Sequence, residues 1–129
     1  MSEQQDKILV VDDDARLRSL LQRFLEEAGY TVKAVGDAEQ MDRALSRELY
    51  SLMVLDLMLP DGDGEDLLPF LHKPGGVSTP VVVFSAKDLS RETAESIQAV
   101  LVKSRTSNKE LLNVICSVIE ASRAEKING

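Results

Sequence analysis

The chain has 129 residues, the length of one domain, and 43% of them are hydrophobic, enough for a core. Its one cysteine, Cys116, excludes an internal disulfide, and neither a signal peptide nor an apolar run of membrane-spanning length is present. The net charge of −7 falls in residues 1–64, with 14 acidic and 7 basic side chains, which disfavours nucleic-acid binding. We therefore expect a cytoplasmic domain without direct contact to membrane or nucleic acid.

The first strand–helix unit is predicted over residues 8–28. Ile8 to Val11 is an apolar run without alternation, which is typical of a strand buried on both faces. Asp14 is placed to cap a helix, and Gly29 is placed to end it. The apolar stripe of this helix comprises Leu17, Leu20, Leu21, Phe24, Leu25 and Ala28.

A second unit follows at once. Residues 31–35 read as a strand, and Asp37 with Gln40 has the spacing of a capping box at the start of a helix. A third buried strand, Leu52 to Leu55, ends before a loop rich in Pro, Gly and Asp over 57–64. The first half of the chain therefore alternates strands and helices with short connections.

The second half continues this alternation. Its predicted elements are a short helix over 65–71, a strand over 81–84, a weak helical stretch over 90–98, a strand over 100–102 and a final helix. Ser107 and Glu110 form a second capping box, and the apolar neighbours of Cys116 predict a core position for it. The fold class is therefore α/β, with a doubly wound, five-stranded parallel sheet.

Polar side chains stand where four of the five strands end. Asp12 and Asp13 follow the first strand, Asp56 follows the third, and Ser85 and Lys103 follow the fourth and fifth. Ligands of parallel α/β sheets bind at the carboxyl ends of the strands, so we expect these residues in one crevice. Three neighbouring carboxylates repel one another unless a cation joins them, and oxygen ligands suit Mg²⁺.

Each of these residues has a role in phosphoryl transfer. Asp56 is the candidate nucleophile, which would form an aspartyl phosphate. Asp12 and Asp13 would hold Mg²⁺, and Lys103 would pair with a phosphoryl oxygen. Ser85 would donate a hydrogen bond to the new phosphoryl group and so couple it to the following loop.

This set resembles the receiver domain of two-component response regulators. The resemblance covers about residues 6–122, and the matching stretches are 8–14, 55–60 with 63–64, 84–87 and 101–103. It implies a flavodoxin-like sheet of strand order 2-1-3-4-5 within a single domain over residues 1–129. Residues 7–60 are similar to receivers of the osmoregulatory winged-helix subfamily, whereas residues 80–119 are similar to receivers of hybrid histidine kinases. A natural divergent receiver and a recombined chain both fit this mixture.

By the same resemblance, Asp56 is the phosphoacceptor, and the Mg²⁺ site comprises Asp12, Asp13, Asp56 and the backbone carbonyl of Met58. Ser85 is the switch hydroxyl, and Lys103 is the conserved lysine. The implied phosphodonor is a histidine kinase or a phosphotransfer protein. An output domain or downstream protein would lie outside this chain, which is expected to be a monomer or weak dimer. It would catalyse its own phosphorylation and dephosphorylation and would act on no separate substrate.

Two positions and one segment depart from the family pattern. Val100 stands where receivers usually have an aromatic residue, and Ser104 stands where most have a proline after the lysine. A cis bond before a non-proline residue costs roughly 3 kcal/mol, so a trans bond is expected there. The segment from Ser85 to Lys103 is about four residues shorter than usual, or about one helical turn. The fourth helix is therefore expected to be short or irregular.

These departures leave a second class of function open, a pseudo-receiver that recognises partners without phosphorylation. A third class, an aspartyl-nucleophile phosphohydrolase, would need an aspartate two residues after the nucleophile. Met58 occupies that position, which argues against this class.

Overall fold

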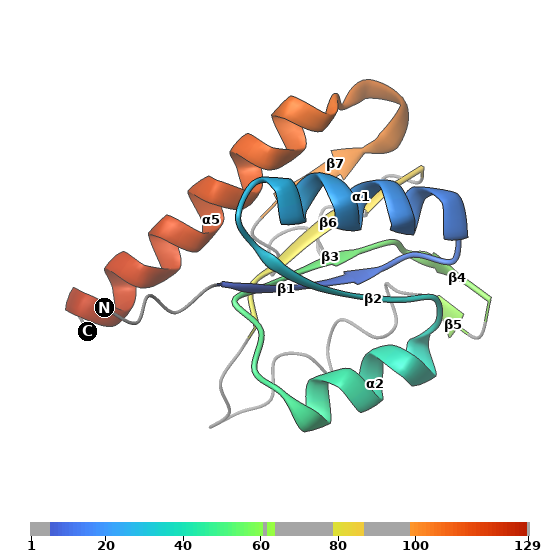
Figure 1. The fold of residues 1–129 in the computed structure, drawn as a ribbon, viewed down its shortest axis with the longest axis horizontal. Coiled ribbons are helices and arrows are strands. Elements are labelled where there is room, and N and C mark those ends of the chain that lie inside the picture. The colour runs from blue at the N-terminus through green and yellow to red at the C-terminus, as the bar shows by residue number, and fades with distance from the viewer. Residues whose placement is uncertain (1–5, 61, 64–78, 87–98, 129) are drawn as a thin grey trace.

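A parallel sheet forms the centre of the computed structural model, which describes residues 6–60, 62–63, 79–86 and 99–128 (Figure 1). The sheet has the strand order β2-β1-β3-β6-β7, and all neighbouring strands run parallel. Its strands are β1 (Lys7–Val11), β2 (Thr31–Val35), β3 (Leu52–Leu55), β6 (Val81–Ser85) and β7 (Ala99–Val102). The predicted order 2-1-3-4-5 is therefore confirmed.

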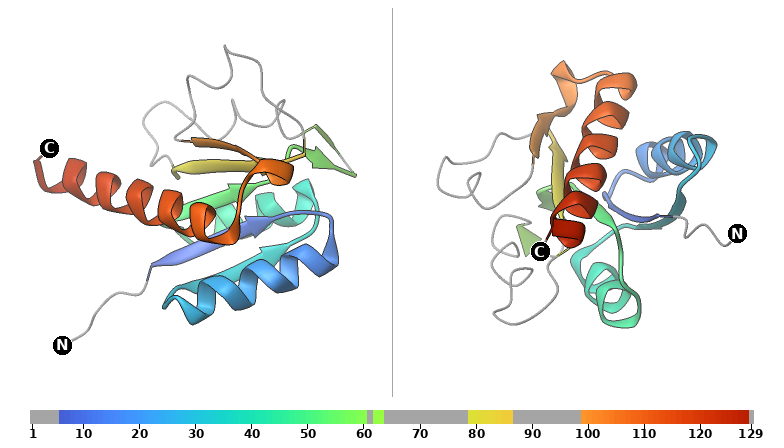
Figure 2. Two further views of the ribbon diagram at one scale, coloured as in Figure 1. Left: turned by 90° about the horizontal axis from the view of Figure 1, so that it is seen from above. Right: turned by 90° about the vertical axis from the view of Figure 1, so that its left-hand side faces the viewer.

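Helices cover both faces of this sheet. They are α1 (Ala15–Glu27), α2 (Ala38–Arg47) and α5 (Asn108–Asn128), and the short 3-10 helix η1 (Lys103–Arg105) joins β7 to α5. Figures 1 and 2 show α1 and α5 on one face and α2 on the other. A small antiparallel hairpin of β4 (Met58–Leu59) and β5 (Gly62–Asp63) lies within the segment predicted to be a loop.

Alternate residues of the strands build two separate cores. On the face of α1 and α5, the buried residues are Ile8, Val10, Leu21, Leu25, Leu52, Val54, Val82, Phe84, Leu111, Ile115 and Ile119. On the face of α2, they include Leu9, Val11, Met41, Ala44, Met53, Leu55, Val81 and Val83. Because successive strand residues point to opposite faces, a strand between two helical layers must be apolar throughout. This requirement explains the unbroken apolar runs.

A side-chain cap begins α1, and a glycine in the left-handed conformation ends it. The Asp14 carboxylate accepts hydrogen bonds from the backbone N–H groups of Arg16 and Leu17, at 3.0 and 3.2 Å. At the other end, Gly29 has a φ of 103°, the left-handed conformation that glycine adopts without a steric cost. The predicted cap and stop of this helix are confirmed.

The two predicted capping boxes form with altered second halves. The Gln40 N–H donates to Asp37 at 2.8 Å, but the Gln40 side-chain oxygen accepts from the N–H of Gly36 at 3.3 Å. The Glu110 N–H donates to the Ser107 hydroxyl at 3.1 Å, and that hydroxyl donates to the Glu110 carboxylate at 3.2 Å. Both helices therefore begin where the sequence predicts.

Three predictions need correction. Leu20 was placed in the apolar stripe of α1, but it is 50% exposed because the buried stripe is centred between Leu21 and Leu25. Ala28, at the end of the stripe, is also exposed, since it is the C-cap residue. Cys116 is only half-buried, and its Sγ lies 3.0 Å from the Tyr30 hydroxyl. The predicted helices over 65–71 and 90–98 lie outside the described residues.

Candidate functional site

The carboxyl ends of β1 and β3 bring Asp12 and Asp56 together. Val11 is in register with Leu55, so the two aspartates follow neighbouring strand ends. The ladder continues past both strands, because the Asp12 N–H donates to the Val35 carbonyl at 3.1 Å and the Asp56 N–H donates to the Val11 carbonyl at 2.9 Å. The sheet itself therefore positions both carboxylates.

Lys103 and Ser85 reach the same carboxylates from the next two strands. The Lys103 ammonium lies 2.7 Å from Asp12 Oδ2 and 3.1 Å from Asp56 Oδ2. The Ser85 hydroxyl donates to Asp56 Oδ1 at 2.8 Å. Ser85 is in register with Val102, which places Lys103 directly beyond it. All four side chains predicted for this crevice from different strands thus meet in the structure.

Each of the two buried carboxylates also accepts a hydrogen bond from a backbone N–H group two residues later in the chain. Asp14 N–H donates to Asp12 Oδ1 at 2.9 Å, and Met58 N–H donates to Asp56 Oδ1 at 3.1 Å. Asp12 and Asp56 are 2% and 4% exposed. Such burial of charge is tolerated only where the oxygens are hydrogen-bonded or ion-paired, as they are here.

Asp13 completes an acidic group that can hold a cation. One carboxylate oxygen from each of Asp12, Asp13 and Asp56 lies within 4.8 Å of the others, and Asp13 is exposed whereas its two partners are buried. Three carboxylates face one ammonium, so the group has an excess of two negative charges. An all-oxygen donor set with one solvent-accessible side suits a hard dication such as Mg²⁺.

The pKa values of Asp12 and Lys103 reflect their burial and their contacts in this group. Burial raises the pKa of Asp12, and the nearby Asp56 carboxylate adds to this effect, while the bonds from Lys103 and the Asp14 N–H oppose it. For Lys103, burial acts to lower the pKa, but the hydrogen bonds with Asp12 and Asp56 outweigh it, so the pKa of Lys103 is raised. Lys103 therefore carries its full charge at neutral pH.

Two further residues, which the sequence did not reveal as part of the site, also contact it. The Arg18 guanidinium donates to the Asp12 backbone carbonyl at 2.8 Å, which fastens α1 to the end of β1. The Lys103 ammonium also lies 6.0 Å from the centre of the Phe84 ring, the range of a cation–π contact. Arg18 is a polar residue of an amphipathic helix, so the sequence carries no signal for its contact across six residues.

The remaining predicted positions lie beside this group. The Met58 side chain is 56% exposed, and its backbone holds Asp56 through the N–H group; a metal-binding role of its carbonyl stays a prediction. The bond between Lys103 and Ser104 is trans, as expected, and it lies within η1. The backbone of Val100 pairs in register with Val83, so the position usually held by an aromatic residue lies in the sheet.

The family model of the response regulator receiver domain matches residues 8–114. The chain belongs to this family. Receiver domains of this family are parts of response regulators in two-component systems, and the predicted family and fold are thereby confirmed.

Several bacterial proteins are similar to this chain in sequence. PetR of Rhodobacter capsulatus is 39% identical over 99 residues, which are 77% of this chain and 41% of that protein. The transcriptional regulatory protein ResD of Bacillus subtilis is 32% identical over an alignment of 130 positions, which covers 95% of this chain and 52% of ResD. The sensory/regulatory protein RpfC of Xanthomonas campestris is 41% identical over 96 residues, but these are only 13% of RpfC. The chain thus spans about half, or less, of these relatives.

Solved structures agree with the fold. The receiver domain of the Francisella response regulator 1452 has a TM-score of 0.82 at 28% identity, over 92% of this chain and 99% of that one. The receiver domain protein of Methanospirillum hungatei has a TM-score of 0.83 at 25% identity, over 95% and 99%. Among the described residues, no helix has the length and apolar character that a membrane span requires.

Proposed function

We propose that residues 1–129 form a single cytoplasmic phosphoacceptor domain, which takes a phosphoryl group onto Asp56 from a histidine kinase or phosphotransfer protein. One observation carries the proposal. The buried Asp56 carboxylate contacts Ser85, Lys103 and the N–H of Met58 and lies beside two further carboxylates. This combination places a nucleophile, a hydroxyl donor, a cation and a set of metal ligands at one point.

The transfer step uses these groups in defined roles. A carboxylate oxygen of Asp56 attacks the phosphorus, and a P–O bond forms as the P–N bond to the donor histidine breaks and the imidazole leaves. The Lys103 ammonium and the Ser85 hydroxyl already contact the two Asp56 oxygens, so they are placed to bind the phosphoryl oxygens. Mg²⁺, held by Asp12, Asp13, Asp56 and the Met58 carbonyl, would neutralise charge on the phosphoryl group.

The phosphorylated state would change protein–protein contacts. Phosphorylation converts the Asp56 carboxylate into a group with a greater negative charge, which draws Lys103 from Asp12 and reorients Ser85. The output domain or downstream protein that reads this change would lie outside the chain. The domain would act on no separate substrate, because the acceptor is its own side chain.

A pseudo-receiver is the alternative. Three departures favour it: Val100 in place of the aromatic residue whose rotamer reports phosphorylation, Ser104 in place of the proline after the lysine, and the shortened segment between Ser85 and Lys103. The bonded group of Asp12, Asp56, Ser85 and Lys103 favours phosphoryl transfer, because a module without this chemistry would have no need for three clustered carboxylates.

Intact-mass analysis after incubation with acetyl phosphate or phosphoramidate, with and without Mg²⁺, tests the proposal. The parent and the variant Asp42→Asn should each gain one phosphoryl group when Mg²⁺ is present. Asp42 is an exposed aspartate on α2 and so provides a matched control. The variant Asp56→Asn should gain none. Equal labelling of Asp56→Asn would contradict the proposal, and no labelling of the folded parent by any donor would favour the pseudo-receiver.

A further inference from the structure

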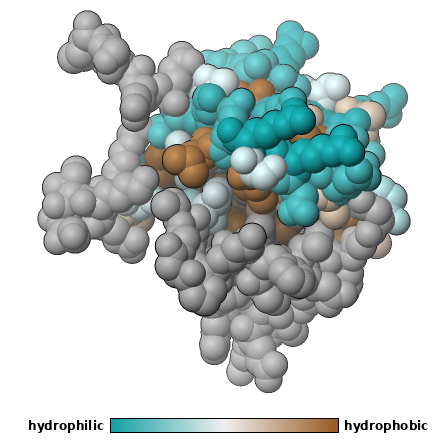
Figure 3. All heavy atoms as spheres, turned by 90° about the horizontal axis from the view of Figure 1, so that it is seen from below, coloured by the Kyte–Doolittle hydropathy of each residue, from teal (hydrophilic) through white to brown (hydrophobic). Residues whose placement is uncertain are grey.

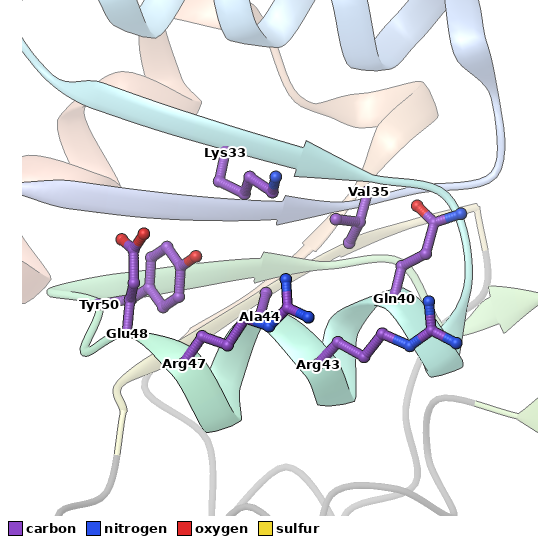
Figure 4. A pocket seen from close by; sticks show the side chains of 8 residues that line it. All are labelled: Lys33, Val35, Gln40, Arg43, Ala44, Arg47, Glu48 and Tyr50. Carbon is purple, nitrogen blue, oxygen red and sulfur yellow. The ribbon is translucent and has the colours of Figure 1, made fainter.

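A second polar region lies beside the edge strand β2, on the face of the sheet that α2 covers. It is an open cavity of ≈ 220 Å³ between the edge strand β2 and helix α2 (Figure 4). The residues that line it are Lys33, Val35, Gln40, Arg43, Ala44, Arg47, Glu48 and Tyr50. Figure 3, seen from the side of α2, shows mostly hydrophilic side chains over the described part of this face.

The cavity has an apolar base and a cationic rim. Val35, Ala44 and Tyr50 are all buried, whereas Lys33 and Arg47 are exposed. Figure 4 shows Lys33 and Val35 reaching down from β2 and the arginines reaching up from α2. A ligand in this space would therefore contact carbon at its base and positive charge at its opening.

The cations of the rim are not all paired. Arg43 contacts Glu39 at 2.6 Å, and Glu48, the acidic residue of the rim, is engaged by Lys7 at 2.8 Å from outside the cavity. Within the described part of the chain, neither Lys33 nor Arg47 has a carboxylate within 4.0 Å. The charge of Glu48 is felt by Lys33 without a direct ion pair, whereas Arg47 has no carboxylate partner among the described residues, so the rim keeps a local excess of positive charge that suits an anion.

Tyr50 adds a hydrogen-bond donor inside the cavity. Tyr50 is only 8% exposed, and Figure 4 shows its hydroxyl directed into the space beside Ala44. No residue described by the structure hydrogen-bonds to this hydroxyl. Burial, aided by Glu48, raises the pKa of Tyr50, so the hydroxyl keeps its proton at neutral pH. Because the hydroxyl faces an open cavity, it is available to donate to an acceptor bound there.

We propose that this cavity binds a small organic anion, with a carboxylate or phosphate between Lys33 and Arg47 and an apolar body against Val35 and Ala44. The Tyr50 hydroxyl would donate to the anionic group, and the Arg47 guanidinium can bind it through two parallel N–H bonds. At ≈ 220 Å³ the cavity is smaller than the roughly 300–1,000 Å³ of pockets for drug-sized ligands, so it suits a smaller anion such as benzoate. The proposal does not depend on phosphoryl transfer to Asp56.

The test is a titration of the full chain, followed by the backbone amide signals in NMR spectra. Benzoate and phenyl phosphate are added without Mg²⁺ and with EDTA, and neutral benzamide serves as the uncharged analogue. Saturable shifts are expected at residues 33–35 and 44–50, with benzamide binding at least about fivefold more weakly than benzoate. The Asp56→Asn variant should bind benzoate as the parent does, which separates this proposal from the proposed function.

Matched variants identify the cations. Arg47→Gln and Lys33→Gln should each weaken benzoate binding about fivefold, and Tyr50→Phe about threefold. Arg23→Gln, which changes an exposed arginine on α1, should have no effect. Two independent cation variants keep the test decisive if one of them does not fold, and thermal unfolding of each variant verifies its fold.

Several results would overturn the proposal. These are the absence of saturable shifts, equal binding of benzamide, an equal effect of Arg23→Gln, or shifts confined to the amides around Asp12 and Asp56. A tighter fit of N-acetylglutamate amide than of benzoate would also overturn it, because the site would then suit an acidic side chain of a protein partner.

Discussion

The two polar regions of this receiver domain are built in opposite ways. At the carboxyl edge of the sheet, Asp12, Asp56 and Ser85 are buried, and each has a partner inside the protein. In the cavity between β2 and α2, the charged groups are exposed, and the Tyr50 hydroxyl has no partner among the described residues. The first region has an excess of negative charge, and the second has an excess of positive charge.

The difference in burial explains why the charged groups of the two regions need different partners. Buried charges need internal partners, and a network of such partners holds a reacting group in one orientation. In an open, cationic cavity, unpaired charges cost little stability, because water solvates them until an anion binds. The proposed phosphoryl transfer therefore suits the crevice, whereas the proposed anion binding suits the cavity.

The substitution Lys103→Met should change the stability of the protein more than any other substitution considered below. It leaves two buried carboxylates without their shared cation, so the free energy of unfolding at pH 7 should fall by about 2–3 kcal/mol. The loss should shrink when Mg²⁺ is added, because the dication replaces the missing charge. Urea unfolding measures both effects, with Lys109→Met, an exposed lysine of α5, as the control. A stability equal to that of the parent would mean that the crevice needs no internal cation.

The substitution Asp12→Asn should stabilise the protein without metal by about 1 kcal/mol, because it removes one of two repelling buried carboxylates. Since the pKa of Asp12 is raised in the folded state, the stability that its protonation contributes is complete below the unfolded value of 3.8 and is lost as pH rises through the folded value. The advantage of the variant should thus grow from pH 4 to pH 7.

Urea unfolding across this pH range, with Asp42→Asn as the control, measures the difference. The variant should also lose most of the stabilisation that Mg²⁺ gives the parent. An advantage that falls with increasing pH would contradict the assignment of Asp12 as a destabilised carboxylate.

The substitution Gly36→Ala tests the link between the two regions. A Cβ at this position would lie 2.7 Å from Arg18 Nη1, so the guanidinium would have to move away from the Asp12 carbonyl. The expected cost is about 0.5–1 kcal/mol, the usual value of one hydrogen bond. In an Arg18→Gln background the same substitution should cost nothing, and a double-mutant cycle measures this coupling. Additive effects would show that the clash is absorbed elsewhere.

The substitution Tyr50→Phe should have the smallest effect on stability. A hydroxyl without a partner contributes little, so the change at pH 7 should be within a few tenths of a kcal/mol. Because the pKa of Tyr50 is raised, its contribution to stability is complete below 10.0 and is lost as pH rises through the folded value. Above pH 10 the parent should therefore lose stability faster than the variant. A loss above about 1 kcal/mol at pH 7 would reveal an internal partner for the hydroxyl.

Most of the crevice could be predicted from the sequence because strand ends are visible in it. The buried runs before Asp12, Asp56 and Ser85 define where each strand stops, and parallel register then brings those stops to one edge. The caps at Asp14 and Ser107 are equally local, since each depends on a side chain and an N–H within three residues. The fold follows from the same alternation.

The cavity could not be predicted in this way. Its lining combines Lys33 of the edge strand with Arg47 and Tyr50 near the end of α2, and their approach depends on the angle at which the helix crosses the sheet. The exposure of Leu20 was missed for a related reason, since the centre of a helical stripe is set by what the helix packs against. The hairpin of β4 and β5 was read as a loop because its strands have two residues each.

The most direct test of the central claim locates the phosphoryl group. The chain is phosphorylated with acetyl phosphate and Mg²⁺, the acyl phosphate is reduced with borohydride to homoserine, and the peptides are sequenced by mass spectrometry. The account predicts homoserine at position 56 alone, in amounts that depend on Mg²⁺. Homoserine at position 12 or 13, or none in the folded, Mg²⁺-treated protein, would contradict the assignment of Asp56 as the acceptor.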